Sequence, residues 1–134
     1  MPIERIEAGD APKASGGYAQ AVRLTGIEEL VFVSGQIPVD VVGRVPASFG
    51  DQCRQVWRNV AAQLDAAGLE LADVVKVTTY LSDRAYAAEN STIRQEVLAG
   101  AAPALTIIVA TIYDPAWLLE IEVIAARRVT EGDG

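Results

Sequence analysis

Two carboxylates near the C-terminus are the first residues of this sequence that could perform acid–base chemistry. Glu120 and Glu122 alternate with apolar residues in the segment LLEIEVIAA, residues 118–126. Residues two apart project from the same face of an extended strand, so the two carboxylates would lie side by side. They could be a paired acid and base, or solvent-facing charges. The pattern alone favours the second reading, because structural carboxylates outnumber catalytic ones.

The remaining composition narrows the possible chemistry. The chain has no histidine, and Cys53 is its only cysteine. Ser-His-Asp and Cys-His arrangements, the usual zinc and non-haem iron ligand sets, an internal disulfide and a CxxC pair are therefore excluded. We expect no metal site, and any catalysis must use carboxylates, hydroxyls, amides and backbone groups. Without a base to activate it, Cys53 is expected to be a small core residue.

Charge and length exclude further classes. The formal charge is −7, with 11 basic against 18 acidic residues, which disfavours a nucleic-acid partner. The 134 residues are 51% apolar, which predicts one domain spanning 1–134 with its own core. No apolar run is long enough to span a membrane, and MPIERIEAGD has charges where a signal peptide needs apolar residues. We expect a cytoplasmic protein with no membrane partner.

The first half of the chain predicts a hairpin and a helix. Residues 20–26 alternate and residues 29–37 are rich in β-branched and aromatic side chains, which indicates a hairpin with its turn between them. Between Asp51 and Ala67, apolar residues recur at helical spacing, and Gly68 follows as a stop signal.

The second half predicts a strand, a helix and two more strands. Residues 72–83 read as a strand, and residues 84–98 as a helix with an inward stripe. That stripe consists of Tyr86, Asn90, Ile93 and Val97. Its amide makes Asn90 a candidate site residue, since a buried amide needs hydrogen-bond partners. Residues 104–112 and 117–128 are strand-like, with an Asp-Pro turn between them.

This order of elements predicts an α+β fold with helices on one face of a mixed sheet, because it contains no repeat and no regular βαβ alternation. The other sheet face is rich in Val, Thr and Ile. Such a face is too apolar for water, which suggests burial against other subunits.

Several segments, in their order and spacing, resemble the reactive-intermediate deaminase family, RidA/YjgF, also called endoribonuclease L-PSP. They are GGYAQAV, VFVSGQIPVD, VPASFGDQCRQVWRNVAAQLDAAGLELADVVKVTTYLSD, AAPA and LLEIEVIAARR. The resemblance implies a chorismate-mutase-like fold with a mixed six-stranded sheet and two helices on one face. It also implies a homotrimer whose sheets form an inner barrel, with ligand clefts between subunits. The implied activity is hydrolysis of enamines and imines, such as 2-aminoacrylate and 2-iminopropanoate, to a 2-keto acid and ammonia, without metal or cofactor.

The resemblance also assigns five cleft positions, which are Tyr18, Ser34, Gly35, Asn90 and Glu120. It makes Glu120 and Tyr18 the expected catalytic residues, with Glu120 holding a water for attack on the C=N carbon. Glu122 is then supporting or interfacial, and the pair is not a dyad. Without the resemblance, Tyr18 could equally be a core aromatic and Asn90 a helix crosslink. Ser34 and Gly35 could then be plain turn residues.

One departure from the family pattern concerns substrate binding. Deaminating members read Pro-Ala-Arg where this chain has Leu105 in third place, and Leu105 cannot clamp a carboxylate bidentately. Such a loss costs on the order of 2–5 kcal/mol. Ile107 replaces a frequent cysteine and makes the expected pocket mouth more apolar, and Gly17 replaces a proline before the tyrosine. Three other arginines could supply the clamp from a neighbouring subunit, although surface charge is the better expectation for each: Arg94, Arg127 and Arg128.

Two function classes therefore stay open. The first is a cofactor-free imine or enamine hydrolase whose substrate lacks the usual carboxylate or presents it differently. The alternative is a non-catalytic trimer that binds a small ligand or a protein partner between subunits, since an apolar replacement of a charged clamp suits binding without chemistry. Ribonuclease activity is disfavoured by the acidic charge and the lack of histidine.

Overall fold

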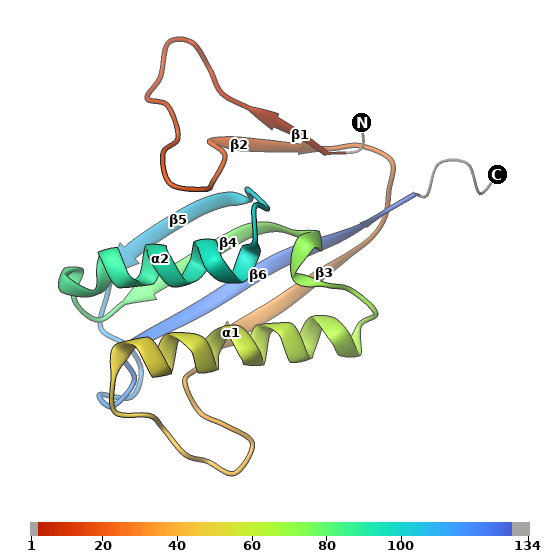
Figure 1. Ribbon diagram of the computed structural model, residues 1–134. Helices are drawn as coiled ribbons and strands as arrows, with labels where there is room; N and C mark the ends of the chain where they lie inside the picture. The colour runs from red at the N-terminus through yellow and green to blue at the C-terminus, as the bar shows by residue number, and fades with distance from the viewer. Residues whose placement is uncertain (1–2, 130–134) are drawn as a thin grey trace.

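The computed structural model describes residues 3–129, which form an α+β fold (Figure 1). The strands are β1 (Ile3–Ile6), β2 (Ala21–Leu24), β3 (Ile27–Gln36), β4 (Val74–Leu81), β5 (Ala104–Val109) and β6 (Leu119–Arg128). The helices are α1 (Phe49–Ala66) and α2 (Ala87–Leu98), and short 3₁₀ turns cover Leu71–Asp73 and Arg84–Tyr86. Both α-helices lie on the same face of the larger sheet (Figure 1). The α+β expectation is confirmed.

The six strands divide between a sheet of four strands and a sheet of two, rather than forming the single six-stranded sheet that the resemblance implied. The larger sheet has the order β3-β6-β4-β5, in which only β4 and β5 are parallel. The smaller sheet pairs β1 with β2 antiparallel and stands apart from the larger one (Figure 1). An isolated bridge between Ala19 and Ala104, with the Ala19 N–H donating to Pro103 O at 2.9 Å, ties the N-terminal segment to β5.

The predicted hairpin between residues 20–26 and 29–37 is wrong. β2 pairs with β1, which the sequence analysis did not anticipate, and β3 pairs with β6. Alternation marks a segment as a strand but does not identify its partner. β3 is ten residues long and β2 only four, so pairing with the ten-residue β6 satisfies more of its backbone groups.

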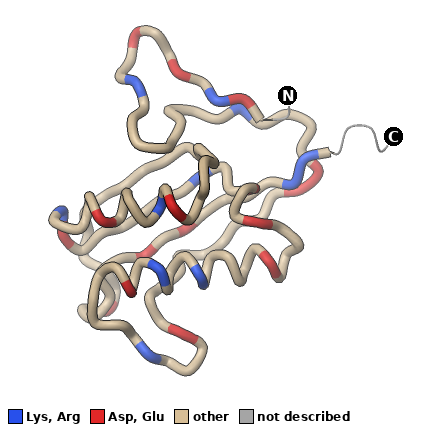
Figure 2. Tube along the Cα trace, in the orientation of Figure 1, with Lys and Arg blue, Asp and Glu red and all other residues tan. Residues whose placement is uncertain are grey.

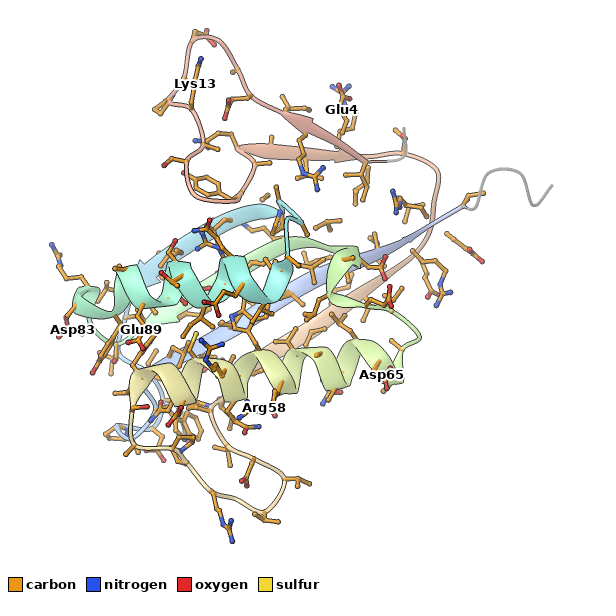
Figure 3. All side chains as sticks on the ribbon, viewed as in Figure 1. Glu4, Lys13, Arg58, Asp65, Asp83 and Glu89 are labelled. Carbon is orange, nitrogen blue, oxygen red and sulfur yellow. The ribbon has the colours of Figure 1, made fainter. Side chains whose placement is uncertain are left out.

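Helix α1 supplies most of the core. The Ser48 hydroxyl accepts a hydrogen bond from the Asp51 N–H at 3.2 Å, which caps the helix and starts it two residues before the predicted Asp51. Its predicted apolar stripe consists of Cys53, Val56, Trp57, Val60, Ala61 and Leu64. All of these residues except the half-buried Ala61 are buried in the core. Side chains of both helices fill the space above the sheet (Figure 3). No helix within residues 3–129 is both long and apolar enough to cross a membrane.

The side chains of the two central strands alternate between the two faces of the larger sheet. The residues buried on the helix side are Val74, Val77, Thr79, Leu81, Leu119, Ile121, Val123 and Ala125. The register shift between Val74 and Lys76 places Val74, rather than Val75, in the core. Glu120 and Glu122 alternate with them and face away from the helices. The opposite face of the sheet therefore carries the carboxylate pair.

The predicted inward stripe of the second helix faces the core. Asn90 and Ile93 are buried, and Tyr86 and Val97 are partly buried and pack against the core. Tyr86 precedes α2 in the 3₁₀ turn and stacks on the Phe49 ring at a centroid distance of 4.5 Å. Arg94 and Leu98 are buried as well, so the buried face of α2 is wider than the predicted stripe.

The expectation of a surface charge is therefore wrong for Arg94, which is 2% exposed. Arg127 pairs with Glu29 at 2.8 Å in a partly exposed ion pair, and Arg128 is exposed. Basic and acidic residues are intermixed along the N-terminal segment and the helices (Figure 2). That mixture offers no continuous basic stripe along the described chain for a phosphate backbone.

Candidate functional site

Glu120 lies against Gly35 across neighbouring strands. Gly35 sits at the end of β3, where the register with β6 shifts between Val33 and Gln36. A Cβ atom added to Gly35 would overlap Glu120 Oε2 and lie 2.8 Å from Glu120 Cδ. Only glycine lets the carboxylate approach the β3 backbone this closely. Two of the expected site residues are thus brought together.

The two carboxylates of β6 have different surroundings. Glu122 Oε1 accepts a hydrogen bond from the Tyr80 hydroxyl at 2.8 Å, and this bond to Glu122 raises the pKa of Tyr80 above its usual value. Glu120 makes no side-chain hydrogen bond or ion pair with any residue of the described range 3–129. Glu122 is held as an acceptor, whereas both oxygens of Glu120 are open to a water or a ligand.

Ser34 lines a depression on the same helix-free face. The depression has a volume of about 350 Å³ and is lined by Phe32, Val33, Ser34, Lys76, Thr78, Glu122, Val123 and Ile124. Its polar lining residues are Ser34, Lys76, Thr78 and Glu122. Lys76 Nζ donates to Thr106 Oγ1 at 2.8 Å. Ser34, Gly35 and Glu120 form the first group of expected site residues.

Tyr18 and Asn90 lie on the other side of the sheet, in the helix layer. Asn90 is 1% exposed, and its Oδ1 accepts from Cys53 Sγ at 3.9 Å. Burial lowers the pKa of Arg94 below its usual value, and the half-buried Tyr18 lies near enough to Arg94 to offset part of this shift. Asn90 and Tyr18 therefore both neighbour the buried Arg94 region.

Leu105 and Ile107 lie on β5 and share the helix-facing side of the sheet. Their register partners on β4 are Val77 and Thr79, both buried. Leu105 is partly buried against the core, and Ile107 is 37% exposed at the sheet edge. Leu105 thus serves packing as well as replacing the expected clamp.

One copy of the chain does not unite the seven expected site residues. The first group, on the helix-free face, consists of Ser34, Gly35 and Glu120. The second group, on the helix side, consists of Tyr18, Asn90, Leu105 and Ile107. A residue of one group can approach the other group only through a second copy or around the edge of the sheet.

Cys53, the only cysteine of the sequence, is buried in the core. Burial raises the pKa of the Cys53 thiol to about 12, so the thiolate is scarce at neutral pH. Within the part of the chain that the structure describes, no cluster of three or more His, Cys, Asp or Glu side chains could hold a metal ion.

The sequence offered Arg94 as a possible clamp from a neighbouring subunit but favoured a surface charge, and it did not predict that Arg94 is buried beside Asn90. Its position was readable, because Arg94 follows Asn90 by four residues and such residues share a helix face. The positive charge of Arg94 nevertheless favoured a solvent-exposed position, since arginine is seldom fully buried without a partner.

Comparisons with known proteins identify relatives of this chain. The family model for endoribonuclease L-PSP matches residues 8–127. A RutC family protein of Pyrococcus horikoshii is 38% identical over 127 residues, which cover 93% of this chain and 98% of that protein. A 2-iminobutanoate/2-iminopropanoate deaminase of Escherichia coli is 43% identical over 79 residues, 58% of this chain and 59% of that protein.

Solved structures of related proteins have the same fold as this chain. The Rid family protein YyfB of Yersinia pestis matches with a TM-score of 0.84 and 26% identity, over 95% of this chain and 100% of that one. TdcF of Escherichia coli, crystallised with bound serine, matches with a TM-score of 0.68 and 37% identity, over 92% of this chain and 98% of that one.

Proposed function

Because the chain belongs to the endoribonuclease L-PSP (RidA/YjgF) family, we propose that it is a cofactor-free imine or enamine hydrolase whose cleft forms between copies of the chain. The observation that carries the proposal is the open Glu120 carboxylate lying against the Gly35 backbone. The deaminase name of the Escherichia coli relative supports the reaction class. The serine bound to the related TdcF supports a small-molecule ligand.

In the proposed reaction Glu120 first acts as a base. A water held by Glu120 attacks the carbon of a protonated imine, the carboxylate takes one water proton, and the C=N π electrons move to nitrogen. Glu120 then returns this proton to the nitrogen of the resulting carbinolamine. The C–N bond breaks as the hydroxyl oxygen forms the C=O bond, and the hydroxyl proton leaves with ammonia as ammonium. The products are a carbonyl compound and ammonium, with no redox change.

Assembly is part of the proposal, since one copy leaves the two groups of site residues on opposite sides of its sheet. The helix-free face supports burial against other copies, because Leu30, Phe32 and Ile108 are 47%, 70% and 45% exposed on it. Large apolar side chains gathered on one face mark an interaction surface. We propose a homotrimer in which these faces form an inner barrel. A second copy then brings Glu120 toward Tyr18 and Asn90.

The substrate is expected to differ from 2-iminopropanoate. Leu105 packs partly against the core and has no group that binds a carboxylate. The proposed substrate is therefore an imine or enamine that lacks the usual carboxylate or presents it at another place in the cleft.

The test measures ammonia release by the wild type, Glu120→Gln and Leu105→Arg. The substrates are 2-iminopropanoate generated in situ, the imino acid formed in situ from leucine, and the uncharged benzophenone imine. We expect the wild type to accelerate hydrolysis of at least one larger imine. We expect Glu120→Gln to lower the kcat for hydrolysis of this imine by about 100-fold or more, as removal of a general base does. Leu105→Arg should gain activity on 2-iminopropanoate.

Glu122→Gln is the matched control, because it removes a carboxylate two residues away on the same face. The Glu122→Gln variant should keep at least about a third of the activity, since Glu122 Oε1 already accepts a hydrogen bond from the Tyr80 hydroxyl. Unchanged turnover in Glu120→Gln would refute the proposed role of Glu120. If neither the wild type nor Leu105→Arg accelerates any imine while both remain assembled, the non-catalytic ligand-binding role takes precedence.

A further inference from the structure

Arg94 is a buried cation with most of its hydrogen-bonding capacity unused. Its Nη2 donates to Gly16 O at 2.6 Å and to Ser91 Oγ at 3.4 Å. Its Nε and Nη1 are buried and have no hydrogen-bond partner within residues 3–129. These two atoms carry three of the five N–H groups of a guanidinium. A buried charge in this condition is costly unless an anion pairs with it.

Asn90 adds a further buried donor beside Arg94. Asn90 lies one helical turn earlier on the same buried face, and its Nδ2 also has no partner within the described chain. The Asn90 carbonyl oxygen already accepts from Cys53. The half-buried Tyr18, whose hydroxyl can also donate, completes this set. Arg94, Asn90, Tyr18 and Cys53 are called the Arg94 cluster below.

Neither of the two acidic side chains of α2 pairs with Arg94. Glu96 of α2 pairs with Arg54 at 3.1 Å. Glu89 lies over the start of α1, where its Oε2 would meet a Cβ atom on Gly50 at 2.5 Å, and Figure 3 shows it near the N-terminal end of α2. Among residues 3–129, Arg94 forms no ion pair. The natural complement of the Arg94 cluster is an oxyanion brought from outside the described chain.

We infer that the Arg94 cluster binds the carboxylate of the substrate, in place of the arginine that Leu105 replaces. This inference rests on the proposed imine hydrolase function and specifies how its substrate is held. A carboxylate offers two oxygens with about four lone-pair positions, which match the free N–H groups of Arg94 and the Asn90 amide. The substrate is then an imino acid whose carboxylate points toward α2 rather than toward the start of β5.

The segment that covers Arg94 contains two glycines with positive φ values. Gly16 and Gly17 have φ values of +90° and +77°, a region that other residues rarely adopt. A Cβ atom on Gly17 would lie 3.0 Å from Gln95 Cγ, so the glycines also let the segment lie directly on α2. Entry of a ligand exchanges the Gly16 carbonyl for a carboxylate oxygen on Arg94. Tyr18 moves with this segment, which links carboxylate binding to the position of the proposed catalytic tyrosine.

The kinetic test compares Arg94→Met and Arg94→Lys on two substrates of the full-length assembled protein. The charged substrate is the imino acid formed in situ from leucine, and the uncharged one is benzophenone imine. We expect Arg94→Met to raise KM for the imino acid by about 30-fold or more, since a charge-assisted carboxylate contact is lost. Arg94→Lys keeps the charge but not the planar guanidinium group. Its KM for the imino acid should therefore lie between those of the wild type and Arg94→Met. Arg84→Gln, an exposed arginine just before α2, is the control and should match the wild type.

A binding measurement separates this inference from the proposed catalysis. Calorimetry with the stable 2-oxo acid of leucine should show binding to the wild type and to Glu120→Gln, and weakened binding to Arg94→Met. Equal KM changes on the charged and the uncharged imine would overturn the inference, because they would show that Arg94 only supports the fold. Dissociation of the assembly in Arg94→Met and Arg94→Lys alike would also overturn it, since Arg94 would then pair with another copy. If Glu120→Gln retains full turnover while Arg94→Met loses binding, the proposed function fails and the carboxylate site stands.

Discussion

Gly35 and Glu120 share a space between β3 and β6 that has no room for a second side chain. A Cβ atom on residue 35 would overlap the Glu120 carboxylate and lie 3.0 Å from its Cγ atom. The glycine therefore sets where the carboxylate can rest, and with it where a bound water can lie.

Gly35→Ala should displace the Glu120 carboxylate and lower kcat by about 10- to 100-fold, because small misplacements of reacting groups are costly. The free energy of unfolding should fall by less than about 2 kcal/mol, since the overlap involves the far end of a flexible side chain. Steady-state kinetics and urea unfolding measure the two effects. Gly9→Ala is the control, because nothing lies within 4 Å of its added Cβ. Wild-type kcat in Gly35→Ala would contradict the prediction.

Phe32→Asp should break the proposed assembly. Phe32 is 70% exposed on the helix-free face of β3, and a carboxylate there would have to be desolvated on association. Light scattering should show a trimer for the wild type and a folded monomer for the variant. Val41→Asp places the same charge on a loop residue that is 102% exposed and should remain trimeric. A trimeric Phe32→Asp would place the subunit interface on another surface.

Gln52→Leu should destabilise the fold by about 2–4 kcal/mol, because three backbone groups lose a buried partner. Gln52 is 2% exposed, and its Nε2 donates to Pro46 O at 2.8 Å and to Ala116 O at 3.0 Å. Its Oε1 accepts from the Leu118 N–H at 2.8 Å, so one amide joins α1 to the loops before α1 and β6. Urea unfolding checks the loss. The same change at the exposed Gln63 should cost less than about 0.5 kcal/mol.

Cys53 should resist thiol reagents in the native protein between pH 7 and about 9. Burial raises the pKa of its thiol from 9.0 to about 12, so the folded state holds the proton that the unfolded chain releases near pH 9. The resulting contribution to stability is fully present below pH 9 and is lost as the pH rises toward about 12. Labelling with a disulfide reagent should follow global unfolding, and the urea-denatured chain should react at once. Rapid labelling of the native protein at pH 8 would show an accessible thiolate instead.

The local periodicity of apolar residues predicted several elements of this fold. The stripe of α1 and the alternation of β4 and β6 were readable because each depends on residues a few positions apart, and burial follows the same period. The side-by-side arrangement of Glu120 and Glu122 followed from the same rule. The expected cleft positions came from a resemblance, and one copy of the chain divides them between the two faces of the sheet.

Strand partners and the surroundings of charged groups were decided by tertiary structure. β3 pairs with β6 rather than β2 because pairing depends on backbone groups nearly a hundred residues apart, which no local pattern encodes. Arg94 is buried because the Gly16 segment folds over α2 and accepts its hydrogen bond from a distance of 78 residues in sequence. The composition determined which side chains are available for chemistry: carboxylates are present and histidine is absent. Only the packing of distant segments determined that Glu122 is occupied, that Glu120 is open, and that a cation lies buried without an anion. The physical reason is that burial and hydrogen bonding depend on neighbours in space.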